Sequence, residues 1–171
     1  MKTIAYLPIA LIVCLLLFSY EVAARGEQDF IMTLKLRDKT WDQTQKLVAD
    51  VIIKNTGRKD LYIGYKCDFG FQGYLVRNLN AFEAIRYEIT WDKSSKNCSP
   101  QREDFIKIPP GRKASITLTS LEVKRLGSLP GDELPKGWYT LFVRYGTSKI
   151  APFDGVFLGT SNTNKVRLLV K

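Results

Sequence analysis

Residues 113–119 have the sequence KASITLT, in which apolar and hydroxyl-bearing side chains alternate one by one. Successive side chains of a strand point to opposite faces, so Ala114, Ile116 and Leu118 would share one face. A strand with one apolar and one polar face is typical of an antiparallel sheet. The Pro-Pro-Gly run at 109–111, just before this stretch, is a strong turn signal. The stretch therefore predicts a half-buried antiparallel strand that begins after a tight turn.

Comparable patterns recur along most of the chain. Short β-prone runs are separated by Gly, Pro and Asn turns, and no run of helical periodicity links them. Only residues 80–85 and 121–126 are predicted as helical turns. An all-β, antiparallel sandwich of about seven to nine strands is therefore expected rather than a parallel sheet, which needs intervening helices. The further predicted strands are 30–36, 46–54, 61–65, 86–91, 105–108, 138–145 and 165–170.

The first 24 residues have the pattern of an export signal. Lys2 supplies a positive charge, residues 4–18 are mostly apolar, and Ala23 and Ala24 precede polar sequence. The apolar run is shorter than the roughly 20 residues that a membrane-spanning helix needs. We expect cleavage after Ala24, a single β-sandwich domain over residues 25–171, and no membrane span after cleavage. The expected location is the periplasm of a Gram-negative host, and otherwise the exterior or the cell surface.

Removal of the signal would leave two of the three cysteines, Cys67 and Cys98. An even pair in an oxidising compartment predicts one disulfide. It would close a loop of about 32 residues and contribute roughly 3–4 kcal/mol. A redox pair is the alternative, but the C-x-x-C spacing typical of such pairs is absent.

The charge balance and the lack of histidine limit the function. The mature chain would keep 25 basic and 16 acidic residues, so its formal net charge stays at +9. This charge favours an anionic partner, although no basic block indicates specific nucleic-acid binding. The absence of histidine excludes Ser-His-Asp and Cys-His catalysis and histidine-bearing metal sites. The adjacent acids at 103–104 and 132–133 do not suggest a facing carboxylate pair. No catalytic residue, metal or cofactor is predicted.

Aromatic residues gather between positions 62 and 74, interleaved with glycines. Glycine permits close backbone approach, and exposed rings can stack on sugars or peptides. Tyr65, Phe69, Phe71 and Tyr74 are therefore candidates for a binding surface. The alternative is that the alternating rings of Phe69 and Phe71 pack inward as ordinary core.

Two further segments are expected to lie at the surface. Arg112 and Lys113 follow the predicted Pro-Pro-Gly turn and could contribute to an anion-binding face. The alternative for this pair is that both charges are simply solvated. Residues 92–104 are polar and are expected to form an exposed loop.

A resemblance to a known fold rests on the C-terminal third of the chain. Residues 134–141, with the sequence LPKGWYTL, resemble the entry to the penultimate strand of immunoglobulin-like domains. Residues 153–170 are similar to the closing strands of exported bacterial immunoglobulin-like domains. The resemblance implies an immunoglobulin-like sandwich in which Gly137 shapes a turn and the hydroxyl of Tyr139 fixes the corner. The spacing of the two cysteines departs from the antibody-type pattern, and the fold itself implies no function.

These observations lead to a functional hypothesis: a non-catalytic exported binding module that recognises a protein or an anionic surface polymer. The alternative is an inhibitor of an exported peptidase or other enzyme, which rests on fold analogy. An enzyme would need a carboxylate or lysine base, and a subunit of a surface assembly would add an edge strand to a neighbour.

Overall fold

Strands and one short turn account for all the regular structure that the described residues contain. The computed structural model describes residues 29–65, 69–79, 84–92, 100–126, 134–147 and 152–171. The all-β expectation is confirmed, since no α-helix occurs in these ranges. The elements are β1 (Phe30–Leu36), β2 (Thr40–Trp41), β3 (Val48–Asn55), β4 (Leu61–Gly64), β5 (Gly70–Asn78), β6 (Ala84–Trp91), the 3₁₀ turn η1 (Arg102–Asp104), β7 (Phe105–Ile108), β8 (Lys113–Arg125), β9 (Gly137–Gly146), β10 (Thr160–Asn162) and β11 (Val166–Val170).

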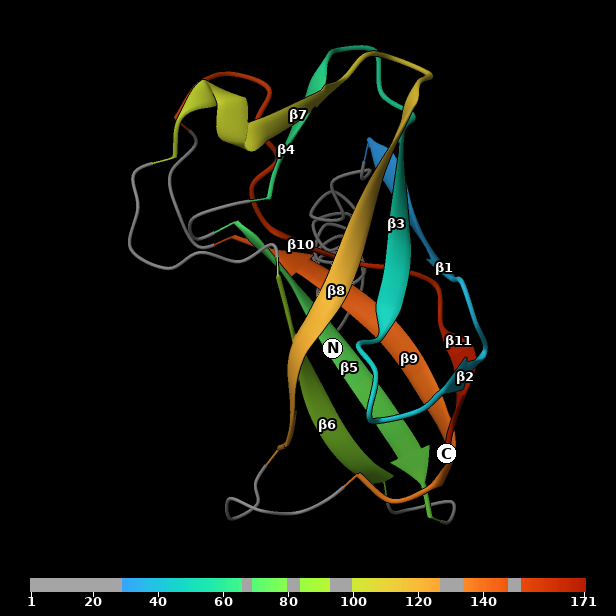
Figure 1. Ribbon diagram of the computed structural model, residues 1–171. Coiled ribbons are helices and arrows are strands. Elements are labelled where there is room, and N and C mark those ends of the chain that lie inside the picture. The colour runs from blue at the N-terminus through green and yellow to red at the C-terminus, as the bar shows by residue number, and fades with distance from the viewer. Residues whose placement is uncertain (1–28, 66–68, 80–83, 93–99, 127–133, 148–151) are drawn as a thin grey trace, which may run out of the picture.

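The strands form one large curled sheet and one small one (Figure 1). The order in the large sheet is β1-β3-β8-β6-β5-β9-β11-β2, and β10 pairs with β9 beside this path. The small sheet contains β4 and β7. All strand pairs are antiparallel except β11 with β2. Antiparallel neighbours can be joined by short turns, so this topology needs no crossover helices.

The long strand β8 turns the sheet back on itself. Its first half, which contains the KASITLT stretch, pairs with β3, and its second half pairs with β6. The register shifts between Thr90 and Trp91, where the strand passes from one partner to the other. Bulges of this kind bend a strand and increase its twist. The helical turn predicted at 121–126 is therefore wrong: the strand continues to Arg125, because pairing with β6 outweighs the weak local preference.

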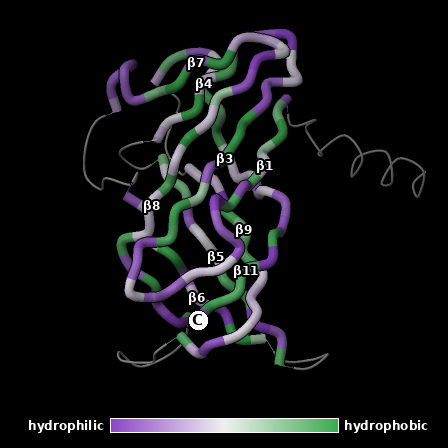
Figure 2. Tube along the Cα trace, turned by 45° about the vertical axis from the view of Figure 1, so that its right-hand side comes forward, coloured by the Kyte–Doolittle hydropathy of each residue, from purple (hydrophilic) through white to green (hydrophobic). Residues whose placement is uncertain are grey.

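The core lies inside the curl. Alternate residues of β3 and β9 are almost fully buried, including Ala49, Val51 and Ile53 on β3 and Leu141 and Val143 on β9. Figure 2 shows hydrophobic residues recurring within the strands, whereas many connecting turns are hydrophilic. The alternation of buried and exposed side chains expected from residues 113–119 thus recurs in other strands of the large sheet.

Strand β5 occupies the centre of the large sheet, although no strand was predicted there. Gly73 interrupts the run of inward-facing side chains, and a Cβ atom at this position would lie 2.8 Å from the indole of Trp91. The buried indole of Trp91 therefore occupies the space that a side chain at position 73 would fill.

The second predicted helical turn, 80–85, is also wrong at its end, because residues 84 and 85 belong to β6. Residues 80–83 lie outside the described ranges.

The small sheet is attached to the large one through aromatic rings and a buried amide. The ring of Phe105 on β7 packs edge-on against Phe69 and Phe153, with centroids 4.9 and 5.1 Å away. The side-chain amide of Asn55 donates to the carbonyls of Lys59 and Ile108, both at 2.8 Å. These bonds satisfy a fully buried polar group and join the end of β3 to β7.

Candidate functional site

The first strand of the chain divides its pairing between the two edges of the curled sheet. The segment β1 pairs with β3, and β2, only a few residues later, pairs in parallel with β11. The facing edges of β1 and β11 form a gap, called the seam below. One end of the seam is bridged by Leu34, whose backbone N–H donates to Asn164 Oδ1 at 2.6 Å. At the other end the N–H of Leu169 donates to the carbonyl of Lys39 at 2.8 Å.

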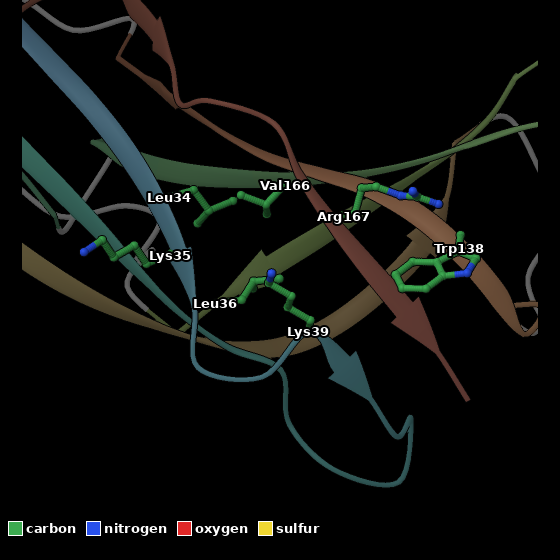
Figure 3. A pocket seen from close by; sticks show the side chains of 7 residues that line it. All are labelled: Leu34, Lys35, Leu36, Lys39, Trp138, Val166 and Arg167. Carbon is green, nitrogen blue, oxygen red and sulfur yellow. The ribbon is translucent and has the colours of Figure 1, made fainter.

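Between these two bridges, no backbone hydrogen bond joins β1 to β11 within the described part of the chain. A hollow of about 590 Å³ occupies this place and is called the seam groove. Its volume lies within the range of pockets that hold small molecules. The lining side chains come from both sides of the seam and from β9 (Figure 3): Leu34, Lys35, Leu36, Lys39, Trp138, Val166 and Arg167.

The lining combines aliphatic side chains with cations and one aromatic ring. Leu34, Leu36 and Val166 provide the aliphatic part. No carboxylate, amide or hydroxyl side chain belongs to the seven lining residues. The groove therefore favours a ligand that has negative charge and apolar surface.

The indole of Trp138 is the exposed tryptophan ring of this protein. Trp138 is 51% exposed, whereas Trp41 and Trp91 are buried. The guanidinium of Arg167 lies over the Trp138 ring, 4.6 Å from its centroid. Such cation–π contacts contribute about 0.5–1 kcal/mol at exposed sites. The contact holds the planar cation of Arg167 beside the groove.

The cations of the seam groove are not neutralised by neighbouring acids. Within the described ranges, Lys35, Lys39 and Arg167 form no ion pair. The nearby Arg37 differs, since its guanidinium lies 3.5 Å from the carboxylate of Asp50. Figure 3 shows the side chain of Lys35 pointing away from the other six and the nitrogen of Lys39 pointing toward Leu36, so Arg167 is the lining cation that lies beside Trp138.

A second hollow of about 510 Å³ lies between β1 and the segment that contains Gly155 and Thr160. Its lining includes two acidic side chains, Asp29 and Asp60, and the cation of Lys59. Asp60 is already paired with Lys107 at 2.7 Å. The mixed charge gives this second hollow no clear preference for an anion or a cation.

The candidate binding residues from the aromatic stretch do not form one surface. Phe69 and Phe71 are 0% and 2% exposed and belong to the core, which corrects the expectation that their rings contact a ligand. Tyr65 is half-buried, and its hydroxyl donates to the carbonyl of Glu103 at 3.2 Å. Tyr74 is half-buried on the outer face of the sheet, where its ring stacks on Phe142 at 5.2 Å. Phe71 and Tyr74 differ in burial because both lie on β5, a central strand whose successive side chains point alternately to the core and to the outer face.

The basic pair from the sequence is exposed but lies away from the seam groove. Arg112 and Lys113 occupy the turn before β8 and its first residue, at the top of Figure 1. Lys113 lies directly opposite Lys54 on β3. The Arg112–Lys113 pair is therefore an exposed basic surface and contributes nothing to the lining of either hollow described above.

Tyr139 and Gly137, which the resemblance singled out, lie at the start of β9. The hydroxyl of Tyr139 donates to the carbonyl of Pro135 at 2.7 Å. Gly137 has a φ of +140°, a backbone conformation that side-chain-bearing residues rarely adopt. Burial raises the pKa of Tyr139 above its ordinary value.

Other sequence-based predictions fall on parts of the chain that are not described. The signal peptide over residues 1–24, Cys67, Cys98 and the acidic pair 132–133 all lie outside the described residues. Of the other acidic pair, Asp104 is buried, and its carboxylate accepts the backbone N–H of Gln101 at 2.9 Å. The carboxylate of Asp104 thus holds η1 in place.

The residues of the seam groove were missed because no local signal connects them. Lys39 and Arg167 are isolated cations in the sequence, and Trp138 was expected only as part of a strand. The pairing of β2 with β11 brings these three residues together. Knowledge of the strand order would have been required to find them.

Comparison with known proteins gives little further information. No family model matches the chain, and no curated protein matches it. A solved structure described as "AvmM Catalyzes Macrocyclization in Alchivemycin A Biosynthesis" is similar, with a TM-score of 0.39 and 8% sequence identity. That match covers 84% of this chain and 89% of the other. A similarity at this level supports no inference about fold or function.

The described residues lack two other kinds of feature. No helix among them is both long and apolar enough to cross a membrane. No group of three or more Cys, Asp or Glu side chains gathers there as a candidate metal site.

Proposed function

We propose that the protein is a non-catalytic exported binding module that recognises an anionic partner, a protein or a surface polymer, through the seam groove. One observation carries the proposal: the cations of Lys39 and Arg167 lie without ion-pair partners among the described residues, in a groove whose lining also includes the exposed ring of Trp138. Unneutralised cations around a concave apolar surface favour an anionic ligand. Export is supported by the signal pattern of residues 1–24.

The composition of the groove supports binding rather than catalysis. General acid–base and nucleophilic chemistry use carboxylates, imidazoles, thiols or hydroxyls in most enzymes. The seven lining side chains carry none of these groups, and the amines of Lys35 and Lys39 are exposed, whereas a catalytic lysine amine is desolvated. Positioned cations and an aromatic ring can hold and orient a ligand without changing it.

We further propose that the curled sheet is an immunoglobulin-like sandwich. Two features support this: the first strand is shared between two edges as β1 and β2, and the corner bond joins Tyr139 to Pro135. In such a sandwich the seam is the place where the first strand crosses from one sheet to the other. The groove is then a consequence of the fold.

A comparison of two double variants tests the proposed function. Lys39→Gln with Arg167→Gln removes the two groove cations, and Arg112→Gln with Lys113→Gln removes the same charge from the turn before β8. Binding to immobilised dextran sulfate is measured for both, with uncharged dextran as the blank. The groove variant should bind at least about tenfold more weakly than the wild type, since a charge-assisted contact contributes about 1.5–3 kcal/mol.

The turn variant should weaken binding no more than about twofold, because it changes only the general positive field. Equal losses in the two variants would show that dextran sulfate senses net charge alone, and the proposed site would be abandoned. Circular dichroism and thermal unfolding of each variant establish that both remain folded.

A further inference from the structure

The shape and chemistry of the seam groove define the kind of anion that fits it. The groove is bounded at one end by the Leu34–Asn164 bond and at the other by the Leu169–Lys39 bond. An extended peptide lying along the seam would have to cross these bridges.

A sugar ring is also a poor match for this lining. Its hydroxyls require donors and acceptors around the ring, whereas the lining side chains among the described residues are aliphatic, cationic or, in Trp138, an indole. Buried hydroxyls without partners would lower the affinity. The aliphatic side chains of Leu36 and Val166 are half-buried and so retain surface that a ligand could cover.

We propose that the groove binds an alkyl anion: a single carboxylate, sulfate or phosphate head on an unbranched aliphatic chain. The head would lie at the guanidinium of Arg167 beside Trp138, and the chain would lie against Leu36 and Val166. This inference rests on the proposed function, since it specifies the group of the anionic partner that enters the groove. The alkyl anion enters as a single group of the partner rather than as part of a membrane surface, because hydrogen bonds bound the groove at both ends.

The test is a titration with butanoate, hexanoate and decanoate, each below its aggregation concentration. Fluorescence of the exposed Trp138 and isothermal calorimetry are recorded together. Burial of each methylene should tighten binding by up to about fourfold, so decanoate should bind at least about tenfold more tightly than hexanoate. Decanol, which has the same chain without charge, should bind at least about tenfold more weakly than decanoate.

A matched pair of variants locates the aliphatic chain. Leu36→Gln places a polar group in the groove, whereas Ile31→Gln makes the same kind of change at an exposed position of the same strand. Leu36→Gln should remove most of the dependence on chain length, and Ile31→Gln should preserve it. Decanoate affinity that is indifferent to Leu36→Gln would place the chain elsewhere and overturn the inference.

Three further outcomes separate this inference from its alternatives. If decanoate binds no more tightly than butanoate while dextran sulfate still depends on the groove cations, the inference fails and the proposed function stands. If neither probe depends on Lys39 and Arg167, both fail. Groove-dependent binding to vesicles of anionic phospholipid, without binding of monomeric decanoate, would overturn the inference in favour of a membrane surface.

Discussion

The two halves of the curled sheet meet in two places, and they meet differently. At β8 a single strand passes from β3 to β6, so backbone hydrogen bonds continue across the corner. At the seam the halves are joined by the Leu34–Asn164 bond and by the parallel pairing of β2 with β11. The interrupted seam, by contrast, exposes aliphatic surface and three cations around a hollow. A break in strand pairing is thus enough to create a candidate site without any inserted loop.

The largest expected loss of stability follows a substitution in the core beside β8. Leu118 is fully buried on the half of β8 that pairs with β3, so Leu118→Ala should lower the free energy of unfolding by about 3 kcal/mol. Leu36→Ala should lower the free energy of unfolding by about 1 kcal/mol, because the side chain of Leu36 at the seam is only half-buried and removes less apolar surface from water. Urea unfolding of both variants measures the difference. Equal losses would mean that the seam is packed as tightly as the continuous corner.

A smaller effect is expected at the bridge that closes one end of the seam. Asn164→Ala removes the acceptor of the Leu34 N–H and should cost about 1 kcal/mol, since water can reach part of this site. Hydrogen exchange of the Leu34 amide should become faster in this variant. Asn162→Ala, an exposed position on β10, is the matched control and should leave both quantities unchanged. Unchanged exchange at Leu34 in Asn164→Ala would contradict a bridging role for Asn164.

The difference between the two places also explains what the sequence could predict. The strands around residues 113–119 and 138–145 were found because their burial alternates locally, in agreement with β8 and β9. Strand β5 was missed because the space at Gly73 is filled by the indole of Trp91 from the neighbouring strand. An alternation that is completed by another strand cannot be seen in one segment.

Prediction of the candidate site from the sequence would have required even more knowledge of the pairing between distant strands. Phe69 and Phe71 formed the most conspicuous local cluster, and both belong to the core. Lys39 and Arg167 are separated by most of the chain and become neighbours only through the pairing of β2 with β11. The sequence shows the positive charges of Lys39 and Arg167, but it does not show that the two residues lie close together.

The smallest change in the free energy of unfolding at neutral pH is expected for a substitution of Tyr145, which lies deep inside the curl and away from the seam. Its ring packs between Phe71 and Phe157, and burial raises the pKa of the Tyr145 phenol above its ordinary value near 10. Above about pH 10 the phenol ionises in the unfolded chain while it stays protonated in the folded one. The folded state then binds more protons, so stability falls with rising pH, by up to about 1.4 kcal/mol per pH unit for this group.

Tyr145→Phe removes this titration, so its free energy of unfolding should fall less steeply than that of the wild type above pH 10. At pH 7, where the phenol is protonated in both states, the variant should differ from the wild type by no more than about 1 kcal/mol. Urea unfolding between pH 7 and pH 11 measures both quantities. Tyr139→Phe is the contrasting variant: it loses the bond to Pro135 and should already cost about 1 kcal/mol at pH 7. An unchanged alkaline slope in Tyr145→Phe would mean that water enters the core beside β9 as readily as it enters the seam.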